Sequence, residues 1–243
     1  MRKRKYKRSL ASSLALNEND MQLHKYQEMN EDECLKNLLL KIDKKTPCLK
    51  FNSDQNKIVP TTHNMVCTSH VLMNCERIDL EIIAKAMPNS SYDRKRFAAI
   101  TIRLDNPKAT ALLFSSGKLV ITGALSTQMA ICANRCIVFR IKQIFPDMSV
   151  RYHAFRIQNI VCNISMHNVK SIDIQKFYEH NGTMCTYQAS IFPGMIWRPL
   201  DSPIVLLVFK SSRIVVTGGK HYQDIVIGFQ DILDTIKPYC IYE

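Results

Sequence analysis

The sequence is poor in the features on which most enzymes and membrane proteins depend. Only seven of its 243 residues are glycine, and none lies in a loop of the kind that cradles phosphate groups. No run approaches the ~20 apolar residues of a membrane-spanning helix, and no apolar signal-peptide core follows the basic first residues. No nucleophile and base stand at a spacing typical of catalysis. We therefore expect a non-enzymatic protein on the reducing side of the cell.

Patterned cysteines are absent as well. The nine cysteines are odd in number and scattered, and no C-x-x-C pair occurs, so neither a disulfide framework nor a zinc ribbon is indicated. The nearest approach to a metal site is Cys132 and Cys136, one helical turn apart, with His63, Cys67 and His70 elsewhere. Scattered cysteines are more often small buried hydrophobic residues, so we expect no metal and no cofactor.

Acidic residues are few for a chain of this length. Asp and Glu number 21 against 33 Lys and Arg, which gives a net charge of +12 and a pI of about 9.3. A basic balance favours polyanionic partners, with nucleic acid first and an anionic membrane surface second. Charge alone does not choose between the two.

Residues 1–57 differ in composition from the rest of the chain. Six of the first eight residues are basic, and a polar, acidic stretch with a short apolar run follows. Such a composition buries too little surface to offset the entropy of ordering, so we expect a largely disordered tail. The basic residues suit a nuclear-import signal or a DNA-touching arm, or simply a solvated tail.

The remainder of the chain repeats itself at a constant offset. Five pairs of matching positions are separated by 95 residues, because 159−64, 192−97, 198−103, 209−114 and 217−122 all give that value. A constant offset indicates two copies of one unit without net insertion. We assign the copies to residues 58–146 and 147–243, and we expect a pseudo-twofold structure.

Each copy has the same predicted order of elements. Period-two patterns predict strands over residues 63–71, 97–104, 109–114 and 119–122. Apolar residues at three- and four-residue steps predict a short helix over 78–87 and a long helix that Ser126 can cap. The second copy repeats the plan with strands over 157–165, 192–198, 204–209 and 214–217 and helices over 172–178 and near the end. Joined, the copies predict one antiparallel sheet with both long helices on one face.

The sheet face opposite the helices is unusually apolar. Alternation places Thr110, Leu112 and Phe114 on this face, and their mates Val205, Leu207 and Phe209 in the second copy. Such a face is normally polar, so an exposed apolar patch marks a binding surface. The alternative is that a further layer covers it. The minor groove of A·T-rich DNA suits this surface, because its floor is apolar and carries few acceptors while phosphates flank it.

Five segments carry a resemblance to a known family: RKRFAAITIR, TALLFSSGKLVITGA, FRIQNIV, IFPGMIWR and IVLLVFKSSRIVVTGG. Together they resemble the core of the TATA-box-binding protein family over residues 58–239. The resemblance implies an α+β, pseudo-twofold saddle of one curved ten-stranded antiparallel sheet, with four helices on its convex side. It implies a nuclear general transcription factor that binds the TATA-box minor groove, bends the DNA and nucleates the pre-initiation complex. The implied partners are A/T-rich promoter DNA, factors IIA and IIB or diverged equivalents, TBP-associated factors and the RNA polymerase machinery.

The same resemblance assigns roles to individual residues. The four intercalating phenylalanines correspond to Phe97, Phe114, Phe192 and Phe209. The residues that line the minor groove or contact base edges correspond to Asn64, Val66, Ala98, Leu112, Val120 and Thr122 in the first copy and Asn159, Val161, Pro193, Leu207, Val215 and Thr217 in the second. The phosphate contacts correspond to Arg96, Arg103, Lys118, Arg198 and Arg213.

The sequence departs from the family pattern in places. His63 replaces a glutamine, and Ser212 replaces the turn glycine that Gly117 provides in the first copy. The loop that docks factor IIB in the family is acidic, but residues 187–190 (Tyr-Gln-Ala-Ser) contain no acid. The first long helix keeps only Arg135, Arg140 and Lys142 of its usual basic residues. The alternative hypothesis is therefore a related factor that acts mainly through altered partners, with reduced or changed DNA binding.

Overall fold

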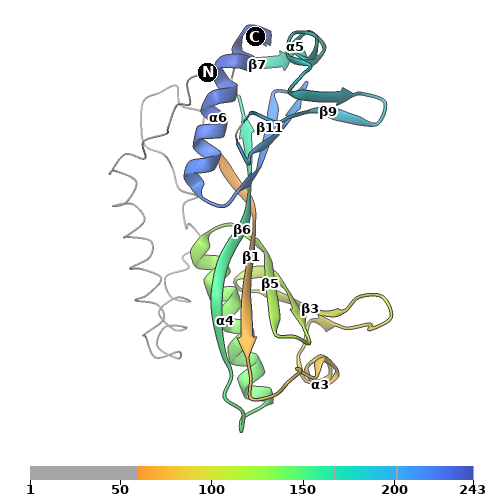
Figure 1. Ribbon diagram of the computed structural model, residues 1–243, viewed down its shortest axis with the longest axis vertical. Helices are drawn as coiled ribbons and strands as arrows, with labels where there is room; N and C mark the ends of the chain where they lie inside the picture. Colours follow the sequence, from red (N-terminus) through yellow and green to blue (C-terminus); the bar gives the residue numbers. More distant parts are fainter. Residues whose placement is uncertain (1–59, 167, 201, 243) are drawn as a thin grey trace, which may run out of the picture. The chain divides into compact units, whose positions relative to one another are not determined.

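The computed structural model describes residues 60–166, 168–200 and 202–242 of the chain. The tail predicted over residues 1–57 lies outside these residues. Ten antiparallel strands form one sheet in the order β2-β3-β4-β5-β1-β6-β11-β10-β9-β8 (Figure 1). Their bounds are β1 Thr61–Leu72, β2 Ser90–Ser91, β3 Ala99–Asp105, β4 Lys108–Phe114, β5 Lys118–Ala124, β6 Arg151–Ser165, β8 Cys185–Gln188, β9 Phe192–Trp197, β10 Val205–Phe209 and β11 Arg213–Gly219.

The strand order reads the same from both ends once the copies are matched. Each copy contributes five strands, and β1 of the first copy pairs with β6 of the second at the centre of the sheet (Figure 1). In this pairing Asn64 lies opposite Val161, and Val66 lies opposite Asn159. The predicted two-copy organisation and single antiparallel sheet are thereby confirmed.

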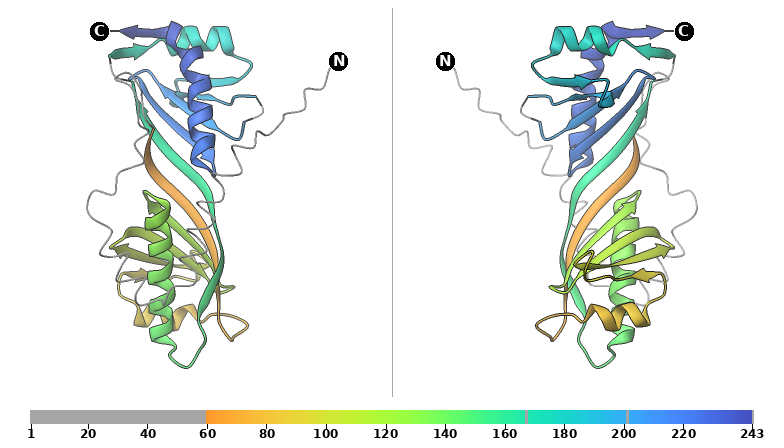
Figure 2. Two further views of the ribbon diagram at one scale, coloured as in Figure 1. Left: turned by 90° about the vertical axis from the view of Figure 1, so that its left-hand side faces the viewer. Right: turned by 90° about the vertical axis from the view of Figure 1, so that its right-hand side faces the viewer.

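Two long helices cover one face of the sheet, as Figure 2 shows. They are α4 (Thr127–Ile144) and α6 (Tyr222–Ile236); the shorter α3 (Leu80–Ala86) and α5 (Ile174–Asn181) complete the four α-helices of the described residues. The predicted cap of α4 is present, because the Ser126 side chain accepts a hydrogen bond of 3.1 Å from the Met129 amide. Each long helix buries one apolar stripe, formed by Ala130, Ala133, Ile137 and Ile141 in α4 and by Ile225, Phe229, Ile232 and Ile236 in α6.

The core lies between these helices and the sheet. Strand residues that face the helices are at most 1% exposed: Ala111, Leu113, Leu119 and Ile121 in the first copy, and Leu206, Val208, Ile214 and Val216 in the second. Full burial of each large aliphatic side chain contributes about 1.5–3 kcal/mol. The stability of the fold therefore comes from one side of the sheet.

Some element boundaries differ from those predicted. Ile172 was predicted to begin a helix but ends β7 (Val169–Ile172), which pairs with β12 (Cys240–Tyr242) in a separate two-stranded sheet. The helix α5 begins only at Ile174, because Asp173 caps it through a 3.1 Å hydrogen bond from the Lys176 amide. β6 begins at Arg151 instead of residue 157, and the register shifts along this extension, where Ala154 has φ 53°.

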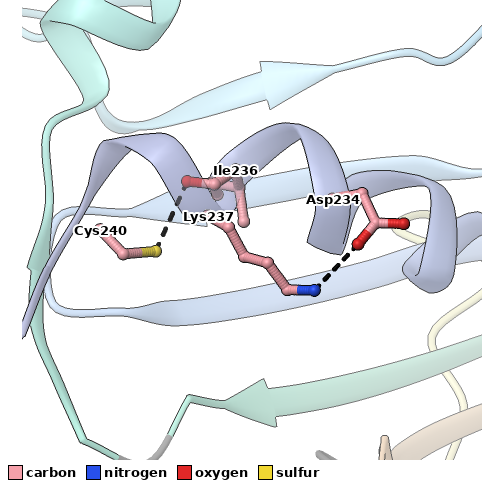
Figure 3. A network of polar contacts seen from close by, with 4 residues as sticks. All are labelled: Asp234, Ile236, Lys237 and Cys240. Carbon is pink, nitrogen blue, oxygen red and sulfur yellow. Dashed lines mark hydrogen bonds and ion pairs between the residues drawn. The ribbon is translucent and has the colours of Figure 1, made fainter.

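A 3-10 helix, η1 (Lys237–Tyr239), connects the end of α6 to β12 of the small sheet. The Cys240 thiol donates a 3.5 Å hydrogen bond to the Ile236 carbonyl, and the Lys237 ammonium donates one of 2.9 Å to Asp234 (Figure 3). The hydrogen bond that Lys237 donates to Asp234 and the negative charge of Asp234 raise the pKa of Lys237. Because the ion pair between Lys237 and Asp234 is exposed, it contributes little stability. We infer that the thiol contact and the pairing of β12 with β7 hold the C-terminal end of α6 in place.

The turns between β4 and β5 and between β10 and β11 show how the copies differ locally. Gly117 has φ 88°, and a Cβ at this position would lie 2.4 Å from the Val71 carbonyl oxygen. Ser212, its mate at +95, adopts φ 60° with a side chain present. The left-handed conformation costs a non-glycine residue about 1–2 kcal/mol. The second turn is therefore strained at the position where the first has glycine.

We expect Ser212→Gly to raise the free energy of unfolding by about 0.5–1 kcal/mol, because relief of the strain exceeds the entropy cost of glycine. Gly117→Ser should lower it by ~2 kcal/mol or more, because the added side chain meets the Val71 carbonyl. Urea unfolding measures both. Ser212→Ala is the control that keeps Cβ and removes the hydroxyl; stabilisation by this variant as large as by Ser212→Gly contradicts the strain argument.

Candidate nucleic-acid interface

The helix-free face of the sheet carries the predicted binding residues. Its side chains are half-buried, in contrast to the fully buried set that faces α4 and α6. No second layer covers this face within the described residues (Figure 2), so the alternative of a covering layer is wrong for this part of the chain. The predicted apolar and hydroxyl residues on it are Val66, Leu112, Val120 and Thr122 in the first copy and Val161, Leu207, Val215 and Thr217 in the second.

An aromatic pair lies in each copy. The Phe97 and Phe114 ring centroids are 6.0 Å apart at 66°, and those of Phe192 and Phe209 are 5.8 Å apart at 69°. Phe97 is 46% exposed and Phe192 36%, so the leading ring of each pair is open to a ligand. Ala98 and Pro193, which follow the leading rings, are exposed as well. The structure thus brings together the two phenylalanines within each copy, and the 95-residue offset relates one pair to the other.

A glycine lies beneath the second aromatic pair. Gly194 pairs with Phe209 across β9 and β10. A Cβ on it would lie 2.7 Å from Phe192 Cε1 and 2.9 Å from Phe209 Cε1. In the first copy Ala99 occupies the matching position opposite Phe114 and is buried. The two rings of the second pair therefore occupy space that a methyl group takes in the first.

The two central asparagines are held by the neighbouring strands. Asn64 Oδ1 accepts hydrogen bonds from the Gly123 amide at 2.7 Å and the Thr122 hydroxyl at 3.3 Å. Asn159 Oδ1 accepts from the Gly218 amide at 2.8 Å and the Thr217 hydroxyl at 3.2 Å. Asn159 Nδ2 also donates a 3.0 Å hydrogen bond to the Thr217 hydroxyl. Because the carbonyl oxygens are occupied, each side chain can offer at the centre of the face an amide N–H that these bonds do not use. This geometry suits a ligand with hydrogen-bond acceptors.

Cationic side chains border the apolar surface. Arg103, Lys118, Arg198 and Arg213 are exposed at matching places in the two copies. Arg96 is also exposed and forms a 3.5 Å ion pair with Asp93, an interaction weak enough for a polyanion to replace. The face therefore combines an apolar centre, central donors and a cationic border.

Four polar residues on this face were not predicted. His70 and Thr68 follow Val66 by alternation along β1, and Gln158 donates a 2.7 Å hydrogen bond from Nε2 to the Thr68 hydroxyl. Alternation from Val66 could have placed Thr68 and His70 here. His153 lies beside His70, but the bulge near Ala154 breaks the alternation in β6 and conceals it in the sequence.

The loop between β8 and β9 carries no charge. Gln188, Ala189 and Ser190 are exposed, and Ile191 is 75% exposed. The Ile191 amide donates a 3.0 Å hydrogen bond to the Gln188 carbonyl, which closes the turn. This loop therefore presents an apolar tip without acidic groups.

The cysteines of α4 form a buried pair. A hydrogen bond with Cys132 lowers the pKa of Cys136 to about 7; burial opposes the shift, and the charge of Arg140 adds to it. Burial raises the pKa of Cys67 to about 12. In the described ranges no three His, Cys, Asp or Glu side chains are grouped as a metal site requires. Across the same residues no helix combines the length and the apolarity needed to cross a bilayer.

The fold and face define a class of protein: two copies of one α+β unit that share a single antiparallel sheet and leave its apolar face open. Comparison with known proteins gives the family. The family model described as transcription factor TFIID (or TATA-binding protein, TBP) matches residues 59–144 and 154–239, which are again 95 residues apart. The chain belongs to this family.

Individual relatives agree with the family match. The TATA-box-binding protein of Saccharomyces cerevisiae is 37% identical over 192 residues, which cover 78% of this chain and 76% of the relative. That of Candida albicans is 38% identical over 183 residues, or 75% of this chain and 74% of the relative. Among solved structures, Methanococcus jannaschii TBP superposes with a TM-score of 0.63 at 30% identity, over 74% of this chain and 98% of that one. The ten-stranded fold expected from the sequence is confirmed.

We expect Asn159→Ala to lower the free energy of unfolding by about 1–2 kcal/mol, because the Gly218 amide and the Thr217 hydroxyl lose their acceptor. Asn159→Asp keeps an acceptor for both groups and should cost less. Chemical denaturation compares the two variants, and Asn64→Ala serves as the matched change in the first copy. Equal losses for the Ala and Asp variants would show that the side-chain carbonyl does not hold this strand.

Proposed function

We propose that this protein is a general transcription factor that binds A/T-rich promoter DNA through the minor groove. The observation that carries the proposal is the open apolar face with an exposed phenylalanine pair in each copy. Family membership supports it, because the relatives are named for binding the TATA box. We expect a gel shift with a TATA duplex and none of comparable affinity with a G·C-rich duplex; equal binding to both contradicts the proposal.

The chemistry of the face suits the minor groove of A·T pairs. That groove offers only the A N3 and T O2 acceptors, whereas a G·C pair adds an exocyclic amino group. Asn64 and Asn159 provide donors for the acceptors, and the half-buried valines and leucines offer no acceptor to the amino group. Lys118 and Arg213 with the bordering arginines provide charge for the flanking phosphates.

The phenylalanine pairs provide a mechanism for bending. An apolar ring inserted between base steps unstacks them at a cost of a few kcal/mol, and contacts that only bent DNA allows offset this cost. The leading ring of each pair is exposed, and its partner supports it edge-on. Each pair is therefore suited to kink the duplex at its own end of the bound site.

We expect Phe192→Ala with Phe209→Ala to remove one kink and leave the other, which lowers the bend measured by energy transfer across an end-labelled duplex. Binding should weaken by about 2–4 kcal/mol, and a duplex already flexible at that step, such as one with a mismatch, should recover part of the loss. Phe97→Ala with Phe114→Ala is the matched change in the first copy. An unchanged bend in both double variants would exclude the wedge mechanism.

The proposed place of action is the nucleus, within the promoter complex. The partners are factors IIA and IIB or diverged equivalents, TBP-associated factors and the RNA polymerase machinery. A specific observation favours a second candidate, a related factor with altered partners: the β8–β9 loop presents Gln188, Ala189 and Ser190 with no acidic group. The two candidates share the DNA-binding face and differ in what the loop recruits.

We expect this protein to recruit a conventional factor IIB weakly, because the loop offers no charge to a basic partner. Gln188→Glu with Ser190→Glu should strengthen the ternary complex on DNA several-fold, with binary DNA affinity changed less than twofold. Gln188→Ala with Ser190→Ala is the uncharged control, and native gels or interferometry measure both complexes. Tight ternary binding by the unmodified chain argues that docking rests on other residues.

A further inference from the structure

Two histidines extend the cationic border across strands β1 and β6, beside the β4–β5 turn. His70 in β1 is the direct partner of Lys118 in β5 and of His153 in β6. The imidazole rings of His70 and His153 meet edge to face, with centroids 5.5 Å apart at 71°. Direct partners on adjacent antiparallel strands share a sheet face. Lys118, His70 and His153 therefore form one row across three strands, which we call the histidine row.

The histidine row lies on the proposed DNA-binding face. Thr68, two residues before His70, pairs with Val120, and Lys118 lies two residues before Val120 in β5. Val120 belongs to the half-buried set opposite the helices, so alternation places Lys118 and His70 on the same side. His70 is half-buried and packs beside the β4–β5 turn, where a Cβ on Gly117 would lie 3.0 Å from its Nε2. His153 is exposed.

No acidic group faces the row from the strands that form it. β1, β5 and β6 contain no Asp or Glu, and the charged residues of β6 nearest to the row are Arg151 and Arg156. The adjoining β4–β5 turn is uncharged. The loop after β1 passes this turn and carries Glu76 and Arg77, both exposed, whose charges offset each other. The surroundings of the histidine row are therefore cationic, and they favour an anionic ligand.

We propose that the histidine row is a proton-linked phosphate contact of the DNA complex, an inference that rests on the proposed function. Strands lie about 4.8 Å apart, so the three side chains span roughly 10 Å. One DNA strand carries a phosphate per ~3.4 Å of helix axis, so a row of this length can meet more than one phosphate. Imidazole changes charge between about pH 5 and pH 8, and an adjacent phosphate favours its protonated form. Binding then takes up protons.

The positions that match the histidine row in the second copy carry no histidine. The mate of the Lys118–His70 pair is Arg213 opposite Ser165, so a hydroxyl stands where the first copy has an imidazole. The position 95 residues before His153 is Ile58. The first row therefore carries a fixed cation and two imidazoles, whereas the matching positions of the sequence hold Arg213, Ser165 and Ile58, the last of which lies outside the described residues. Proton uptake is assigned to the first copy alone.

The experiment measures the affinity of the full chain for a TATA duplex from about pH 6 to about pH 8 at constant salt. We expect the wild-type dissociation constant to rise about tenfold over this range, as one to two protons are linked to binding. His70→Gln with His153→Gln should reduce the rise to about twofold or less. Titration calorimetry in two buffers of different ionisation enthalpy counts the protons directly.

The charge-preserving variant separates a phosphate contact from a structural role. His70→Lys with His153→Lys should bind at pH 8 as the wild type does at pH 6. At pH 8 its affinity should also depend more steeply on salt than that of the wild type, by one to two phosphate neutralisations. His180→Gln, on α5 and remote from the face, is the histidine control and should leave the pH profile unchanged. Circular dichroism at each pH confirms that every variant is folded.

Retention of the wild-type pH profile by the double Gln variant overturns the inference, as does a loss of stability with no change in that profile. Either result leaves the proposed function intact, because the wild type still prefers the TATA duplex. Failure of the wild type to bind either duplex at any pH instead contradicts the proposed function, and the inference with it. Both proposals are supported if the wild-type affinity falls with rising pH, the Gln variant loses this dependence, and the Lys variant binds tightly at every pH.

Discussion

The pairing of β1 with β6 is the contact on which the candidate interface depends. Each copy supplies five strands and ends at an open inner edge, and an unpaired edge of this length invites association with other chains. Joining the two edges produces one continuous sheet and one continuous face (Figure 1). The register also sets Asn64 against Val161 and Asn159 against Val66, so the central donors are placed symmetrically. A slip of one residue would turn these side chains into the core.

The one-sided arrangement of helices explains why the opposite face can be specialised. Because α4 and α6 both lie on the same side, almost all apolar burial occurs there. The residues of the other side therefore contribute little to the stability of the fold and can be specialised for binding. An open apolar face promotes association between copies, which a net charge of +12 opposes. The same charge attracts a polyanion. Solubility and affinity for nucleic acid thus have a common electrostatic origin.

Much of this arrangement could be predicted from the sequence because it depends on local patterns. The constant offset of 95 located the two copies, and alternation in β4, β5, β10 and β11 separated the buried face from the open one. The short strands β2 and β8 have too few residues to alternate. The pairing of β7 with β12 joins segments about 70 residues apart, and the bulge near Ala154 shifts the face on which later residues of β6 lie. Those features depend on tertiary contacts, as does the hydrogen bond between Gln158 and Thr68.

The symmetry of the fold is retained at the centre of the face and lost toward its ends. The Oδ1 atoms of Asn64 and Asn159 accept matching hydrogen bonds, whereas Ala99 and Gly194 leave different space beneath the two aromatic pairs. Ala98 and Pro193 differ beside the exposed rings, and the histidine row has no counterpart in the second copy. A symmetric centre cannot distinguish the two directions of a duplex. For the proposed DNA partner, any preferred orientation must therefore come from the ends, where bending and phosphate contact are unequal.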